Sequence, residues 1–224
     1  GLPLCRGYCM AINPMWRKTL SQWFRQLDTW GSKRNRMALR LSDIFFDFQP
    51  VWGHNTDLAR RLRGHITKML REDRAFLRAM YDETSDHNVG LGLFGGFVTE
   101  KENPYYRGQI NLKHHALLPL IEGARLFSLR EGVEQTGTLA RIDALHERGI
   151  LNANEREDLK GAFVQITNLL LGQQIADFRI GRKVTYFIHP DSLSKRVKEH
   201  LAAAMKAIDR LRDRVRAELT GNLS

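Results

Sequence analysis

The chain has 224 residues, 42% of them hydrophobic and 27% charged, which is an ordinary composition for a globular protein of one or two domains. No apolar run approaches the roughly 18 residues of a membrane span, and no signal peptide opens the sequence, so we expect a cytoplasmic protein with no membrane partner. The net charge of +10 favours an anionic partner such as nucleic acid, nucleotide phosphates or an acidic domain. The two cysteines, Cys5 and Cys9, are too few for a disulfide framework and lack the companions of a metal site.

The first forty residues predict one short strand and then helix. Residues 5–12 have a strand-like composition. In residues 16–30 the apolar side chains recur at helical spacing, and Gly31 is the expected end of that helix. We interpret the three tryptophans of this stretch as core residues. Residues 33–41 predict a short basic helix or turn.

An apolar run followed by a lone carboxylate stands out in residues 41–58. The apolar residues 44–46 precede Asp47, and Pro50 and Gly53 follow as breakers, which predicts a short buried strand. A carboxylate within such a strand costs several kcal/mol, roughly, unless a partner or solvent compensates it. Asp47 is therefore expected either on the wet face of a half-buried strand or at the lip of a cleft.

The remaining sequence predicts a mainly α-helical bundle. Between two groups of helices, residues 91–113 carry four glycines and a polar tip, which favour a β-hairpin. Gly90, Gly92, Gly95 and Gly96 resemble a phosphate-binding loop only weakly, because no Lys-Ser/Thr pair follows them. Helices are expected, from their apolar periodicity and end signals, at residues 58–70, 76–82, 117–129 before Gly132, 138–145 before Gly149, 154–175 with Asn154 and Glu157 as a capping box, and 190–219.

No complete catalytic motif is present. Asp43 and Asp47 could share one face of a strand, as metal-binding carboxylates of nucleotidyl transfer do, but no further carboxylate pair is evident. Two Arg-to-His spacings, Arg141 to His146 and Arg182 to His189, are typical of a helical class of RNase. A chance match with ordinary surface or core histidines is the favoured explanation, because the chain has 35 Lys and Arg residues and eight histidines.

A further hypothesis is that the chain binds an anionic ligand without transforming it. Donor side chains gather around the junction between the hairpin and the following helix, and the alternative is that they are helix caps and solvated cations. The residues are Asn111, Lys113, His114, His115, Arg125 and Arg141.

Several short motifs occur in a fixed order along nearly the whole chain. They are Cys5-Arg6-Gly7-Tyr8-Cys9-Met10-Ala11, Asn13-Pro14-Met15-Trp16-Arg17, Phe46-Asp47-Phe48, Val51-Trp52-Gly53, Leu58 with Leu62, Gly92-Leu93-Phe94-Gly95, Leu112-Lys113, Ala124-Arg125, Thr138 with Arg141, Gln174, and Pro190-Asp191-Ser192-Leu193-Ser194. In order and spacing they resemble the C-terminal part of a bacterial family described as putative nucleotidyltransferases. In that family this part is the substrate-binding domain.

The resemblance implies a function in signalling. Family members usually place this domain after a nucleotidyltransferase core, often with cyclic-nucleotide-binding or CBS modules. They are similar in kind to the uridylyltransferases of nitrogen regulation and to the helical domain of kanamycin nucleotidyltransferase. The family's Gly-Ser and Asp-x-Asp motif would lie before residue 1, so Mg²⁺ and a nucleoside triphosphate are expected for the full architecture and no cofactor for this chain alone.

The resemblance also implies candidate site residues. Asp47 is the candidate third carboxylate, and Lys113, His114, Arg125 and Arg141 are the candidate substrate-binding residues. Four positions depart from the family pattern and put a polar site built on them in doubt: Gln49 and Leu170 replace Arg, and His54 and Asn111 replace Asp.

The sequence thus predicts a substrate-recognition part of a nucleotidyltransferase that is non-catalytic by itself. Residues 1–54 are expected to be the edge of a nucleotidyltransferase-like domain and residues 55–224 the helical bundle. The expected partners are the core domain and a protein substrate. The alternatives are a basic RNA-binding or RNase module, and a bundle that forms a homodimer through an apolar stripe on its last helix.

Overall fold

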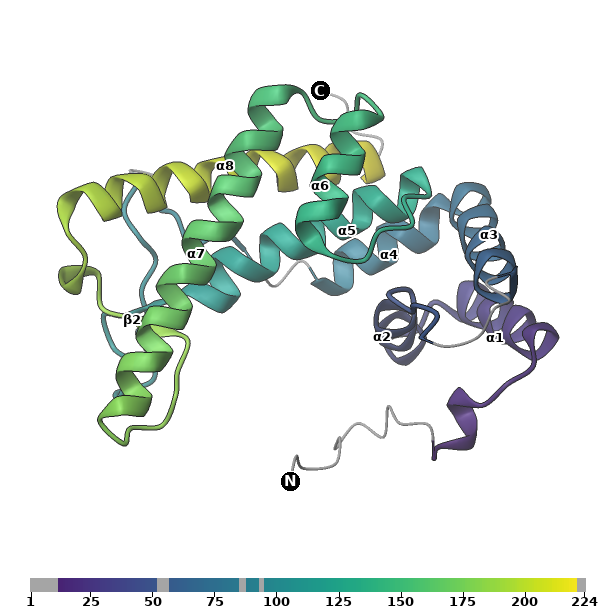
Figure 1. Cartoon of the computed structure of the whole chain (residues 1–224), viewed down its shortest axis with the longest axis horizontal. Coiled ribbons are helices and arrows are strands. Elements are labelled where there is room, and N and C mark those ends of the chain that lie inside the picture. Colours follow the sequence, from purple (N-terminus) through teal and green to yellow (C-terminus); the bar gives the residue numbers. More distant parts are fainter. Residues whose placement is uncertain (1–11, 52–56, 85–87, 93–94, 221–224) are drawn as a thin grey trace. The chain divides into compact units, whose positions relative to one another are not determined.

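The computed structural model describes residues 12–51, 57–84, 88–92 and 95–220 (Figure 1). The chain divides into two compact units, Gly1–Met80 and Tyr81–Ser224. Most described residues lie in helices, and a two-stranded antiparallel sheet accompanies them. The prediction of a mainly α fold is therefore confirmed. The strand expected at residues 5–12 lies almost wholly outside the described residues.

The first unit contains the helices α1 (Leu20–Lys33), α2 (Arg36–Phe45) and α3 (Asp57–Glu72) and most of α4 (Arg74–Thr84). Thr19 and Gln22 form a capping box that begins α1. The helix continues through Gly31, contrary to expectation, and ends at Arg34, whose backbone is left-handed with φ of 44°. Gly31 instead lies close to the side chain of Met69 on α3.

The strand predicted around Asp47 is wrong. Residues 36–45 form α2, and Asp47 lies in the turn that follows it. Asn35 caps this helix by accepting a hydrogen bond from the backbone N–H of Ala38 at 2.9 Å. Among the described residues, the first unit therefore has no β element.

Aromatic side chains form the core between α1 and α2. The ring of Phe45 stacks on Trp23 with 4.0 Å between centroids, and Trp16 and Trp30 lie 6.2 and 6.1 Å from it. Trp23 and Trp30 are buried, as expected for core residues. Aromatic pairs at these distances stabilise the fold by more than the burial of their apolar area alone.

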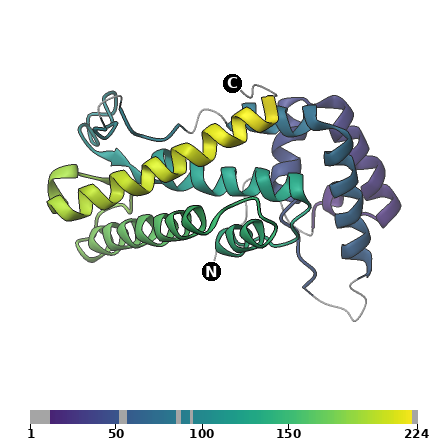
Figure 2. The same ribbon diagram turned by 90° about the horizontal axis from the view of Figure 1, so that it is seen from above.

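The second unit is built on four helices, α5 (Leu118–Glu131), α6 (Thr138–Glu147), α7 (Ala153–Arg179) and α8 (Lys195–Thr220). Helix α5 packs against α6 and α8, and α7 packs against the same two helices. Figure 2 shows α7 along one edge of this unit. Gly132 and Gly149 end their helices in the left-handed conformation, as predicted.

Two local predictions in this unit need correction. The capping box of α7 is formed by Asn152 and Glu155, two residues earlier than expected. Residues 190–192 form a separate 3-10 turn, and α8 begins at Lys195. The apolar stripe of α8 is buried inside the unit and is not available as a subunit interface; its members are Leu201, Met205, Ile208, Leu211 and Val215.

The sheet joins distant parts of the second unit. Strand β1 (Ile110–Asn111) pairs with β2 (Phe187–Ile188) in antiparallel register. The hairpin expected at residues 91–113 is reduced to a single bridge between Leu91 and Phe97, and the strand at its end pairs with β2 instead. The sheet thereby connects the start of α5 to the α7–α8 connection.

Among the described residues, no helix is both long and apolar enough to cross a membrane.

Candidate functional site

A cluster of aromatic and basic side chains surrounds the β1–β2 sheet. The rings of Tyr106 and Phe187 stack with 4.1 Å between centroids and an interplanar angle of 3°. The ammonium nitrogen of Lys113 lies 4.4 Å from the ring centre of Tyr186. The backbone N–H of Leu112 donates to the carbonyl oxygen of Tyr186 at 3.0 Å, which fixes the two segments together. We call Tyr106, Lys113, Tyr186 and Phe187 the aromatic–basic cluster.

Lys113 begins an irregular turn of helix. Residues Lys113–Leu117 are π-helical and run directly into α5. The side-chain oxygen of Asn111 accepts a hydrogen bond from the backbone N–H of His114 at 3.1 Å, so Asn111 acts as a local cap. Single π-helical turns occur frequently at functional sites. The turn presents His114 to solvent and Lys113 half-buried at the cluster.

A carboxylate organises the loop that leads to β1. Glu100 accepts hydrogen bonds from the backbone N–H groups of Lys101 and Glu102 at 2.9 Å and of Asn103 at 3.2 Å. The bonds from Asn103 and Glu102 lower the pKa of Glu100 below its usual range. Glu100 therefore stays negatively charged, and its carboxylate is bound by the backbone of its own loop. It does not neutralise the charge of Lys113 by direct contact.

The other two candidate substrate-binding residues lie away from Lys113. Arg125 is on α5, twelve residues further along the helix, or about 18 Å along the axis. Arg141 on α6 is 2% exposed, and its Nε donates to the carbonyl oxygen of Gln135 at 2.9 Å. This hydrogen bond holds the α5–α6 connection in place. Because the side chain of Arg141 is buried, a ligand could contact Arg141 only if that connection moved. Lys113 and His114 lie on the same π-helical turn. Arg125 and Arg141 lie elsewhere in the second unit, and a role of either residue in substrate binding stays a prediction.

Asp47 belongs to the first unit and has a basic neighbour that the sequence did not reveal. The guanidinium of Arg63 on α3 donates to the carbonyl oxygens of Phe46 at 2.5 Å and Phe48 at 2.8 Å, on either side of Asp47. Its carbon also lies 4.2 Å from the ring centre of Phe48. The turn that holds Asp47, which is itself half-buried, is therefore built around a buried cation.

The residues that departed from the family pattern have different local environments. Gln49 is exposed, Leu170 is buried in the core of the second unit, and Asn111 caps the π-helical turn. His54 lies outside the described residues.

The histidines of the two Arg-to-His spacings each have a local hydrogen-bond partner. His146 contacts the carbonyl oxygen of Leu151 at 2.8 Å through Nδ1 and so closes the α6–α7 connection. The Nδ1 of His189 accepts a hydrogen bond from the backbone N–H of Asp191 at 3.2 Å at the start of a 3-10 turn. Both contacts explain the histidines as local caps, and RNase activity stays a prediction.

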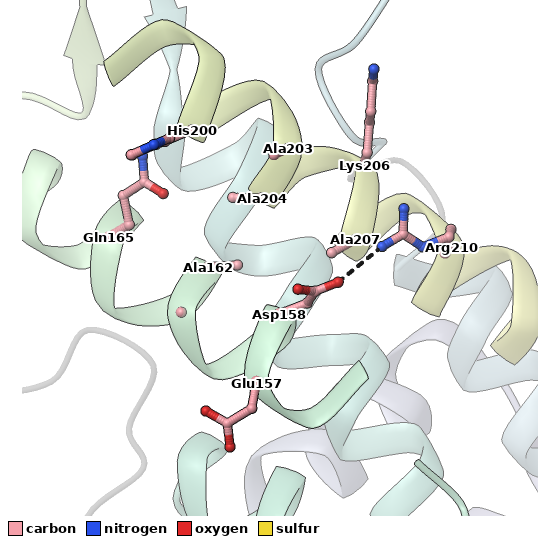
Figure 3. Close-up of a pocket in the computed structure, with 11 residues that line it drawn as sticks. Glu157, Asp158, Ala162, Gln165, His200, Ala203, Ala204, Lys206, Ala207 and Arg210 are labelled. Atoms are coloured by element: carbon pink, nitrogen blue, oxygen red, sulfur yellow. Dashed lines mark hydrogen bonds and ion pairs between the residues drawn. The ribbon is translucent and has the colours of Figure 1, made fainter. Parts of the chain in front are cut away.

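A groove of about 370 Å³ lies between α7 and α8 (Figure 3). Its floor is made of small residues, and Asp158 and Arg210 form an ion pair of 3.3 Å across it. His200 and Gln165 point toward each other at its other end in Figure 3. None of the candidate residues Lys113, His114, Arg125 and Arg141 lines this groove. It is therefore a separate surface feature.

The described residues do not fit a metal ion on their own. Within these ranges no three His, Cys, Asp or Glu side chains gather in an arrangement that could hold one.

The second unit is mainly helical, and the aromatic–basic cluster lies at its two-stranded sheet. A family model described as "Putative nucleotidyltransferase substrate binding domain" matches residues 74–219, more than half of the chain, and the chain belongs to this family. A second model, described as a putative nucleotidyltransferase, matches residues 1–37. No curated protein and no solved structure matches the chain significantly.

Proposed function

We propose that this chain is the substrate-recognition part of a nucleotidyltransferase and that it does not transfer nucleotides by itself. The observation that carries the proposal is the match of residues 74–219 to the substrate-binding family. The match of residues 1–37 to a nucleotidyltransferase model supports a core domain of that class as its partner. That core would supply the metal-binding carboxylates, Mg²⁺ and the nucleoside triphosphate.

The proposed contact surface for the substrate is the aromatic–basic cluster together with His114. Lys113 provides a positive charge whose position is fixed by the ring of Tyr186 and by the π-helical turn. His114 is exposed on the same turn. Such a surface suits a protein substrate that presents a carboxylate or phosphate beside an aromatic or apolar group. A role in signalling follows from the resemblance to regulatory nucleotidyltransferases and is part of the proposal.

The proposal is tested by measuring label transfer from α-³²P-labelled nucleoside triphosphates with Mg²⁺ to the proteins of a cell extract. The chain alone should transfer nothing. The chain together with a core domain that carries the Gly-Ser and Asp-x-Asp motif should label a target. Transfer by the chain alone that is abolished by Asp47→Asn would contradict the proposal, because it would place a complete site within these residues.

A matched pair of variants tests the surface. Lys113→Met removes the charge and keeps the length of the side chain, and it should reduce labelling by about tenfold, the effect of losing one charge-assisted contact. Lys68→Met, on an exposed face of α3, is the control and should leave labelling unchanged. If Lys113→Met also leaves labelling unchanged, the aromatic–basic cluster is not the substrate contact.

A further inference from the structure

The connection between α7 and α8 is strongly basic. Residues 179–196, all of which the structure describes, contain five Lys and Arg residues and one acidic residue. All five cations are exposed, and none forms an ion pair within the described part of the chain; they are Arg179, Arg182, Lys183, Lys195 and Arg196. The carboxylate of the acidic residue, Asp191, lies 3.6 Å from the ammonium nitrogen of Lys198. The connection therefore carries positive charge that the described residues do not neutralise.

A buried carboxylate holds the first part of this connection in place. Asp177, near the end of α7, is 6% exposed and accepts a hydrogen bond from the side-chain amide of Gln173 at 3.0 Å. It also accepts hydrogen bonds from the backbone N–H of Thr185 at 3.3 Å and from its hydroxyl at 3.2 Å. The backbone N–H of Arg182 donates to the carbonyl oxygen of Asp177 at 2.9 Å. Both ends of the segment that carries Arg182 and Lys183 are thus tied to the same residue.

This segment leads directly into the aromatic–basic cluster. Thr185 immediately precedes Tyr186, whose ring lies 4.4 Å from the ammonium nitrogen of Lys113. Strand β2, which follows, lies beside the C-terminal part of α7 (Figure 1). Two apolar side chains, Ile180 and Val184, are 62% and 45% exposed among the cations. The result is a surface on which positive and apolar groups alternate up to the cluster.

We propose that the α7–α8 connection docks an acidic segment of the substrate protein, and that Asp177 is a positioning residue that holds the connection for it. This inference rests on the proposed function, because it extends the same contact surface and names the class of substrate segment. Carboxylates of the segment would pair with Arg179, Arg182 and Lys183, since arginine binds carboxylates in a bidentate geometry. Apolar residues between those carboxylates would contact Ile180 and Val184.

The aromatic rings of the cluster favour a protein segment over a single-stranded nucleic acid. Nucleic-acid strands gain much of their affinity by stacking bases on open aromatic faces. The ring of Tyr186 is instead covered on one face by Lys113, and the rings of Tyr106 and Phe187 stack on each other. Rings that are engaged in this way offer less area to bases, whereas the cations beside them stay exposed.

Fluorescence anisotropy with the full chain tests the docking surface. The probe is a fluorescein-labelled peptide that combines glutamate and leucine with serine spacers, and its control has glutamine in place of each glutamate. The glutamate peptide should bind about tenfold more tightly than the control, and its affinity should fall as NaCl rises from about 50 to about 300 mM.

A matched pair of double variants locates the binding site on the chain. Arg182→Gln combined with Lys183→Gln should raise the dissociation constant of the glutamate peptide about tenfold. Lys206→Gln combined with Arg216→Gln removes the same charge from exposed positions of α8 and should change it less than about twofold. Circular dichroism checks that both double variants remain helical.

Asp177→Ala separates positioning from charge. The substitution removes a negative charge, so electrostatics alone would strengthen binding of the glutamate peptide. If Asp177 positions the connection, the alanine variant should instead bind several-fold more weakly. Asp177→Asn keeps an acceptor for Thr185 and should retain most of the affinity. Thr185→Val removes the hydroxyl donor without a change of charge, and it gives the same test if Asp177→Ala loses helicity.

Several results would overturn the inference. They are equal binding of the two peptides, a glutamate peptide that the Arg182 and Lys183 substitutions do not weaken, and tighter binding of a single-stranded RNA with the same sensitivity to those substitutions. An alanine variant of Asp177 that binds more tightly than wild type would remove its positioning role.

These outcomes are independent of the label-transfer experiment, because peptide binding needs no core domain. Label transfer that depends on Lys113 but not on Arg182 and Lys183 would overturn the docking of an acidic segment and leave the proposed function standing. Salt-sensitive binding of the glutamate peptide by a chain that never supports label transfer would do the reverse.

Discussion

The ammonium group of Lys113 lies over the ring of Tyr186, with 4.4 Å from its nitrogen to the ring centre. This contact joins the π-helical turn before α5 to the residue that precedes β2. A cation held over an aromatic face gains about 0.5–1 kcal/mol at a partly exposed site. The same contact orients the charge that we propose for substrate recognition.

A double-mutant cycle should measure this contact directly. Lys113→Met and Tyr186→Leu, alone and together, should show a coupling of about 0.5–1 kcal/mol in the free energy of unfolding by urea. A second cycle that combines Lys113→Met with Tyr106→Leu is the control, because Tyr106 stacks on Phe187 and not on Lys113. Equal coupling energies in the two cycles would mean that Lys113 interacts with the aromatic–basic cluster as a whole and not specifically with the ring of Tyr186.

Arg63 should be essential to the stability of the first unit. Its buried guanidinium donates to the carbonyl oxygens of Phe46 and Phe48, and Arg63→Met would leave both carbonyls without this donor. We expect a loss of about 2–3 kcal/mol in urea unfolding. Arg60→Met removes an exposed ion pair with Asp57 and should cost less than about 1 kcal/mol. If both variants lost a similarly small amount of unfolding free energy, water would be shown to replace the hydrogen bonds that Arg63 donates to Phe46 and Phe48.

The helical part of the fold could be predicted because it depends on local signals. Apolar periodicity located α3 to α8, and Gly132 and Gly149 marked two helix ends. The segment before Asp47 misled the prediction because Phe45 and Phe46 favour strands, whereas in the chain Phe45 ends α2 and stacks on Trp23, and Phe46 packs near Phe76. Pairing of β1 with β2 joins residues far apart in sequence, and no local pattern encodes it.

The candidate site was only partly predictable for a related reason. Lys113 and His114 were singled out because they follow a predicted strand and precede a predicted helix, and their role in binding stays a prediction. Tyr186 and Arg63 were missed because each acts across a long sequence separation. The exposed apolar face of α7, which carries Val164, Leu171, Ile175 and Phe178, was missed because its spacing of three and four residues is the same as that of a buried helix face. Only burial in the structure distinguishes the two faces.

Asp143 should make the stability of the second unit depend on pH. On α6 it accepts hydrogen bonds from Lys160 at 2.9 Å and Arg156 at 2.6 Å on α7. The hydrogen bond from Lys160, followed by the contact with Arg156, holds the pKa of Asp143 below its usual value of 3.8. Because the folded pKa is lowered, the stabilisation is present at pH 7 and is lost as the pH falls below about 4.

Asp143→Asn should therefore lower the free energy of unfolding at pH 7, and the difference from wild type should vanish near pH 2. We expect about 0.5–1 kcal/mol, since a third of the side chain is exposed and solvent screens the pair. Asp209 provides the opposite case, because partial desolvation and then the charge of Asp213 raise its pKa. Asp209→Asn should cause no loss in the free energy of unfolding at pH 7. A loss equal to that of Asp143→Asn would contradict the conclusion that the contacts with Lys160 and Arg156 cause the effect at Asp143.

Gly90 should tolerate no side chain, because it lies against the π-helical turn. A Cβ at Gly90 would lie 2.6 Å from the Cβ of His115, and the backbone N–H of Gly90 donates to the carbonyl oxygen of His115 at 2.9 Å. Gly90→Ala must therefore displace one of the two segments, at a cost of about 1–3 kcal/mol in urea unfolding. Gly64→Ala is the control, since a Cβ there meets no atom within 4 Å and alanine should stabilise α3 by about 0.5–1 kcal/mol.

Because His115 lies two residues after Lys113, Gly90→Ala should also reduce the Lys113–Tyr186 coupling. An unchanged coupling would show that the π-helical turn keeps its position when Gly90 moves.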